Sequence, residues 1–224
     1  MSKIKKSGSG FTLLELAVVG AIITILALII LPNYRQGEKQ SALLRSTHKL
    51  AQDLRRAEEM AISAQKTPPE FDPEESFPKG GYGIYFEINP PQDLCLSALE
   101  GKGYCIILFA DCDGEADFDP RGSSFTCAGA TPGAGYSYNE TMEELTLEEG
   151  IKIKNLQLLL SDGSLLPVDS LSVTFTPPEP TVTIQSEGAE GENEAVVTLS
   201  VKDNPTITRT ITVNKAGLIE TKKP

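Results

Sequence analysis

The order of apolar and polar residues divides the chain into three parts. From Phe11 to Leu31 almost every residue is apolar. A helix rises about 1.5 Å per residue, so a run of this length can cross the roughly 30 Å hydrocarbon layer of a membrane. The sequence therefore predicts a transmembrane helix at residues 11–32. The one acid in the run, Glu15, lies where a carboxylate needs a partner.

Beyond Pro32 the apolar residues follow a helical period. They recur at intervals of three, four and seven, which is the spacing of one stripe along a helix. The flanking positions are charged, as on a solvated face. We therefore expect one helix from about Thr12 to Gln65, loosened or kinked at Pro32, whose amphipathic half at residues 33–65 packs under a sheet. The stripe consists of Leu43, Leu50, Leu54, Ala57, Ala61 and Ala64.

The remainder of the chain has the pattern of strands. Four prolines and two glycines at residues 66–81 predict an irregular crossover. The sequence therefore predicts an α+β fold. In it, a long N-terminal helix, first transmembrane and then amphipathic, packs against an antiparallel sheet at residues 82–224. Alternating, β-branched runs occur at residues 82–88, 104–110, 150–160 and 170–176, and two closing hairpins are predicted at residues 180–203 and 206–221.

The charge balance limits the partners and the orientation of the chain. With 31 acidic and 20 basic residues the formal net charge is -11, so direct binding of nucleic acid is not expected. Lysines precede the apolar run and no basic cluster follows it, which orients the N-terminus toward the cytoplasm. We therefore expect a single-pass protein of the inner (cytoplasmic) membrane, with its C-terminal domain outside, in the periplasm or the extracellular space.

A short basic leader precedes the apolar run. Its small residues, Ser7 to Gly10, come before that run, whereas an ordinary secretory signal has them after it. A leader ending in Gly10, followed by FTLLELAVVGAIITILALIILP, resembles the class III signal of type IV pilins and type II secretion pseudopilins. The head is similar to H-type minor pseudopilins and FimT-like pilins in DLRRAEEMAISAQ, in an acidic loop that follows FA, and in VNKAGLIE.

This resemblance implies that a prepilin peptidase removes residues 1–10, cuts between Gly10 and Phe11, and methylates the new amino group of Phe11. The carboxylate of Glu15 would attract the amino terminus of a neighbouring subunit, and Pro32 stands at the family's distance from the processed terminus. Phe11 and Glu15 also share a helix face, so a pair within one chain is an open alternative. The implied partners are other pilin or pseudopilin subunits, the peptidase, a membrane assembly platform and the lipid bilayer.

Acidic residues occupy every second position in the loop after residue 110. Carboxylates at this density suit calcium, although the loop lacks the glycine and glutamate positions of an EF-hand. An acidic turn facing solvent is the alternative, so calcium is a candidate ligand and no cofactor is required. The alternating residues are Asp111, Asp113, Glu115, Asp117 and Asp119.

The four cysteines lie close together in the sequence and lack the spacing of a zinc site. In an exported domain, disulfides are the expected state. Four cysteines allow three pairings, which the sequence does not separate. The local pairing would join Cys95 to Cys105 and Cys112 to Cys127.

Motifs of catalysis are absent from the sequence. The single histidine, His48, lies off the apolar stripe and is expected to face solvent. No nucleophile elbow, phosphate-binding loop or metalloprotease motif occurs, so we do not expect an enzyme. Two functions remain: a structural subunit of a type II secretion pseudopilus or type IV pilus, or an uncleaved, membrane-anchored extracellular β-domain that binds calcium or a surface ligand. The sequence does not separate secretion from pilus or DNA-uptake systems, nor a major from a minor subunit.

Overall fold

The structure is a computed structural model that describes residues 11–68, 77–92, 94–112, 114–118, 140–177, 181–186, 189–190 and 194–223, without the side chains of residues 29–35 and 189–190. The chain divides into two compact units, residues 1–40 and 41–224. The first unit contains the start of helix α1 (Leu13–Ile62), and the second contains the rest of α1 and all of the described strands.

Helix α1 ends earlier than the sequence indicates. The chain leaves the helix after Ile62, and Ala64 adopts a left-handed conformation with φ 46°. The Gln65 amide donates to the Met60 carbonyl, and the Ala64 amide donates to the Ala61 carbonyl. These two bonds form a Schellman motif, which satisfies carbonyls that the helix end would otherwise leave unpaired. Gln65, where the sequence predicts the helix to end, is therefore the residue whose amide closes the cap.

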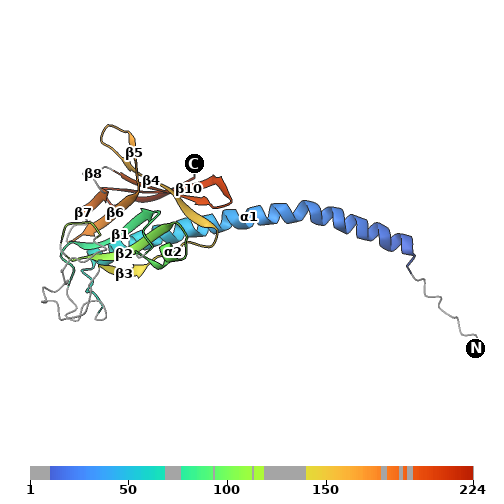
Figure 1. Ribbon diagram of the computed structural model, residues 1–224, viewed down its shortest axis with the longest axis horizontal. Helices are drawn as coiled ribbons and strands as arrows, with labels where there is room; N and C mark the ends of the chain where they lie inside the picture. Colours follow the sequence, from blue (N-terminus) through green and yellow to red (C-terminus); the bar gives the residue numbers. More distant parts are fainter. Residues whose placement is uncertain are drawn as a thin grey trace, which may run out of the picture. The chain divides into compact units, whose positions relative to one another are not determined.

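The strands form two antiparallel sheets (Figure 1). A short helix, α2 (Leu96–Leu99), joins β1 to β2. The first sheet has the order β3-β2-β1-β6-β7-β8 and contains β1 (Gly81–Ile88), β2 (Tyr104–Asp111), β3 (Thr141–Glu144), β6 (Ser170–Thr176), β7 (Thr181–Ser186) and β8 (Ala189–Glu190). The second has the order β11-β10-β9-β4-β5 and contains β4 (Ile151–Leu159), β5 (Leu165–Val168), β9 (Glu194–Val201), β10 (Asn204–Asn214) and β11 (Ile219–Lys222).

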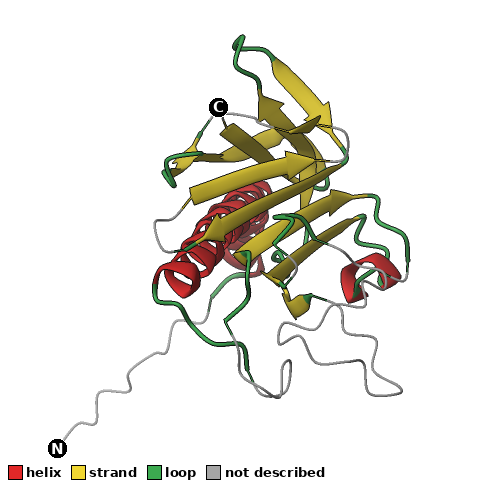
Figure 2. Cartoon of the chain, turned by 90° about the vertical axis from the view of Figure 1, so that its left-hand side faces the viewer, coloured by secondary structure: helices red, strands yellow, loops and turns green. Residues whose placement is uncertain are grey.

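One hydrophobic core joins the second half of α1 to the inner faces of both sheets. Figure 2 shows strands of the two sheets arching over the helix. The predicted stripe is confirmed for its first five members, since Leu43, Leu50, Leu54, Ala57 and Ala61 are all buried. Ala64 is exposed because it lies in the cap rather than on the helix. The prediction that His48 faces solvent is confirmed.

The expected α+β fold class, with one sheet against the helix, is wrong. Strands predominate among the described residues, and they form two antiparallel sheets. The sequence pattern failed here because alternation reports which face of a strand is buried, but not which sheet the strand joins. Strands β7 and β9 illustrate this, since β7 pairs with β6 in the first sheet and β9 pairs with β4 and β10 in the second.

The expected transmembrane segment at residues 11–32 is also contradicted. Within the part of the chain that the structure describes, no helix is both long and apolar enough to cross a membrane. The expected single-pass localisation in the inner membrane rested on that segment and is overturned by the same finding.

The prediction of the first of the two closing hairpins is wrong. Within residues 180–203, β7 pairs with β6 and, over two residues, with β8 in the first sheet, whereas β9 pairs with β4 and β10 in the second, so the expected pairing of β7 with β9 is not formed. The last hairpin is confirmed: β10 pairs with β11, and Lys215 to Gly217 lie in the turn.

Candidate functional site

The first turn of α1 is closed by a reciprocal set of hydrogen bonds between Thr12 and Glu15. The amide and the hydroxyl of Thr12 both donate to Glu15 Oε2, each at 2.8 Å. The Glu15 amide donates in return to the Thr12 hydroxyl at 3.2 Å. This is a capping box, in which the sequence Thr-x-x-Glu satisfies amides that the helix start would leave unpaired. The acid in the apolar run therefore has a partner within its own chain.

The helix surface that follows this cap is apolar and exposed. Between Phe11 and Leu28, eleven large apolar side chains are each at least 51% exposed, and they surround the helix rather than forming one stripe. The hydroxyl of Thr24 donates to the Gly20 carbonyl at 2.8 Å, so this polar group is satisfied within the helix. Isolated exposed leucines are ordinary on proteins, but a continuous apolar surface indicates a binding surface.

Two of the expected processing and assembly residues are not fully described by the structure. Gly10 lies outside the described residues, and the side chain of Pro32 is among those that the structure leaves out. Phe11 is 87% exposed, so the residue that would become the new N-terminus is accessible.

The acidic loop after β2 is organised around one buried carboxylate. Asp111 is fully buried, and its two oxygens accept hydrogen bonds from the Gly114 amide at 2.7 Å and the Ala116 amide at 2.8 Å. A side chain at Gly80 would collide with this carboxylate, which explains why a glycine stands there. Asp111 therefore shapes the loop from inside.

The candidate calcium ligands are only partly within the structure. Glu115 and Asp117 are described, whereas Asp113 and Asp119 lie outside the described residues. In the described ranges no group of three or more His, Cys, Asp or Glu residues is placed to hold a metal ion. Calcium binding by the whole loop stays a prediction.

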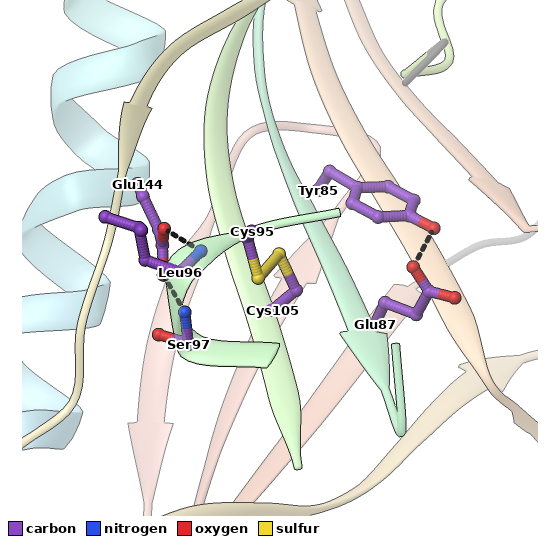
Figure 3. The surroundings of a disulfide bond; sticks show 7 residues. All are labelled: Tyr85, Glu87, Cys95, Leu96, Ser97, Cys105 and Glu144. Atoms are coloured by element: carbon purple, nitrogen blue, oxygen red, sulfur yellow. Dashed lines mark hydrogen bonds between the residues drawn. A yellow bond between two sulfur atoms is a disulfide. The ribbon is translucent and has the colours of Figure 1, made fainter. Parts of the chain in front are cut away.

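The cysteines form a second feature of the head. Cys95 and Cys105 are joined by a disulfide, which is the first of the two local pairs (Figure 3). The second pair would join Cys112 to Cys127, and Cys127 lies outside the described residues. The disulfide fastens the segment before β2 onto β2 itself.

Beside the disulfide lies a contact that the sequence did not reveal. Both carboxylate oxygens of Glu144, on β3, accept hydrogen bonds from the first amides of α2. The donors are Leu96 and Ser97, each at 2.7 Å, and Figure 3 shows the carboxylate facing both amides. Glu144 is 47 residues from Ser97 in the sequence, so no local pattern indicates the pair.

Charged side chains join α1 to β3 and to the segment that follows it. Arg45 donates two hydrogen bonds of 2.7 Å to Glu148, and Arg56 donates one of 2.7 Å to Glu143. The Arg45 guanidinium holds the pKa of Glu148 below its ordinary value. All four side chains are substantially exposed, so each pair contributes little to stability.

Comparisons of this chain with protein-family models, with curated proteins and with solved structures find no significant match. Its function is therefore argued from its own residues.

Proposed function

We propose that the chain is a structural subunit of a pilin-type filament, either a type II secretion pseudopilus or a type IV pilus. In this proposal the leader is removed after Gly10, and the N-terminal helix packs among the helices of neighbouring subunits. The leader and the residues from Phe11 to Pro32, which resemble the class III signal, motivate the assignment.

The observation that supports the proposal most is the exposed apolar surface of α1 between Phe11 and Leu28. Burying one large apolar side chain contributes about 1.5–3 kcal/mol. Eleven such side chains, even partly covered, supply on the order of 10 kcal/mol, which exceeds the lower estimates of the cost of association. A helix that is apolar on every side requires neighbours on every side, which a helical filament core provides.

The capping box is compatible with a pair between subunits. An ionised carboxylate has about four lone-pair sites, and Thr12 uses two of them on Glu15. A free amino terminus at Phe11 would be largely positive at neutral pH, because its reference pKa is about 7.7–8.0. It can therefore bind the same carboxylate without displacing Thr12. This pair would set the register of one subunit against the next.

The test replaces Glu15 and a matched acid on the same helix. Glu15→Gln removes the charge but keeps an acceptor for Thr12, and Glu38→Gln changes an exposed glutamate downstream of the apolar surface. Each full-length variant is expressed in a host that carries a prepilin peptidase and an assembly platform, and sheared filaments are quantified by immunoblot.

We expect Glu15→Gln to be cut after Gly10 like the wild type but to yield at least tenfold fewer filaments, with Glu38→Gln unchanged. Wild-type yields for Glu15→Gln would contradict the pairing. A wild-type chain that never enters filaments would overturn the proposed function.

A further inference from the structure

We propose that Glu144 is a positioning residue for the Cys95–Cys105 disulfide: it holds α2 against β3, so that the cap and the disulfide stabilise one another. The segment of residues 94–103, called the α2 lid here, lies between β1 and β2. This inference concerns the head alone and does not depend on the filament proposal.

The α2 lid covers an apolar face of the first sheet. Cys105, Ile107 and Phe109 on β2 are fully buried on the side away from the main core. Leu94 and Cys95 of the lid pack on this cluster. The lid therefore keeps water from side chains that a bare sheet would expose, and its closure has an apolar driving force of its own.

Helix α2 cannot cap its own start. Its N-cap residue is Cys95, which has an extended backbone and makes no side-chain capping bond, because its sulfur is bonded to Cys105. The first amides of a helix need acceptors. Glu144 supplies both oxygens from β3, at 2.7 Å to the Leu96 amide and 2.7 Å to the Ser97 amide. Hydrogen bonds to an ionised carboxylate are stronger than those between neutral groups.

Glu144 is itself held independently of the lid. Glu144 pairs with Ile107 in the ladder between β3 and β2, and the amide of Leu145 donates to the Ile106 carbonyl on β2 at 2.8 Å. The carboxylate is therefore presented by an anchored strand. When the disulfide is open, the same two hydrogen bonds form less completely, and they bring the Cys95 thiol beside Cys105 whenever they form.

The consequence is a thermodynamic linkage between the disulfide and the hydrogen bonds of Glu144. Reduction of the disulfide by an external thiol pair takes up two electrons and two protons, gives two cysteine thiols and converts the reductant to its own disulfide. If the Glu144 bonds form better in the oxidised lid, they shift this equilibrium toward oxidation, and the disulfide strengthens the bonds in return by the same factor. Loss of a helix cap changes an equilibrium by roughly 3- to 30-fold.

The experiment measures the thiol–disulfide equilibrium of Cys95 and Cys105 in the folded, full-length chain. Samples are equilibrated in glutathione buffers, quenched, alkylated and digested with trypsin, and the state of Cys95 is measured by mass spectrometry of the peptide of residues 80–102, in which Cys95 is the only cysteine. The variants are Glu144→Ala and Glu144→Gln. The controls are Glu143→Ala, which removes the neighbouring ion pair, and Ser97→Ala, which removes a buried hydroxyl that has no hydrogen-bond partner among the described residues.

We expect Glu144→Ala to lower the oxidation equilibrium constant by about tenfold, within a 3- to 30-fold range, and Glu144→Gln to lower it less. Glu143→Ala and Ser97→Ala should stay within twofold of the wild type. An unchanged constant in Glu144→Ala would overturn the proposal. An equal fall in Glu143→Ala would also overturn it, because the effect would then come from loosening of β3.

A second measurement covers the case in which Glu144→Ala fails to fold. Hydrogen exchange of the lid peptide is compared between a Cys95→Ala/Cys105→Ala chain, which gains no side-chain cap at the start of α2, and the same chain with Glu144→Gln. Protection of the first α2 amides in the first chain and at least a threefold loss in the second support docking by Glu144 without the disulfide. Equal exchange in both chains would contradict it.

Discussion

The contribution of α1 to the core of the head can be tested with Leu54→Ala. Leu54 lies in the second half of the helix, is fully buried, and belongs to the cluster that includes residues from both sheets. Replacing a buried leucine by alanine removes apolar contacts and leaves a cavity, at a cost of about 2–5 kcal/mol. For a chain of this size that corresponds to a fall in Tm of roughly 4–20 °C.

The matched control is Leu14→Ala on the same helix. Leu14 is 73% exposed, and alanine is as good a helix former as leucine, so its unfolding free energy should stay within about 0.5 kcal/mol of the wild type. Both variants are unfolded with urea at one fixed concentration of mild detergent and followed by circular dichroism. If Leu54→Ala were as stable as Leu14→Ala, the second half of α1 would not be part of the core.

Three further predictions concern single positions. Gly83→Ala would place a Cβ 2.6 Å from the ring of buried Phe109, so we expect it to lower stability by about 1–3 kcal/mol or more in urea unfolding; a neutral result would contradict the tight approach. Glu148→Gln should lower Tm slightly at pH 7, and the difference from wild type should vanish in acid. The reason is that Arg45 depresses the pKa of Glu148, so its contribution is complete above pH 4.5 and is lost as the pH falls through the lowered pKa; a constant difference down to pH 3 would refute this. Thr12→Ala removes one side of the capping box and should speed hydrogen exchange in the first turn of α1 without changing Tm; unchanged exchange would argue against the cap.

Local features of the fold could be predicted from the sequence. The stripe from Leu43 to Ala61 follows from helical spacing, and β1, β2, β4 and β6 begin and end within one residue of the alternating runs. These features depend on neighbours close in the chain. The Thr-x-x-Glu spacing at the start of α1 is equally local and identifies the capping box, whereas the resemblance gives Glu15 an amino terminus as its partner, in a neighbouring subunit or in the same chain.

Non-local features could not be predicted. Strand β7 could pair with β9 or with β6, because both have the residue pattern of a strand. The choice depends on packing between strands, so periodicity does not predict that β7 pairs with β6. The bond between Glu144 and α2 joins chain segments that are 47 residues apart in the sequence, so no local spacing reports it. The short edge strands β3 and β5 have too few residues to show a pattern. Their positions follow from the strands beside them.

The most direct test of the filament proposal is the mass of the chain's N-terminus in assembled filaments. Filaments are sheared from cells, and the intact subunit is analysed by mass spectrometry with sequencing of its first residues. The proposal predicts that residues 1–10 are missing and that the chain begins with N-methylated Phe11. A filament subunit that still carries its first ten residues would contradict the proposed function.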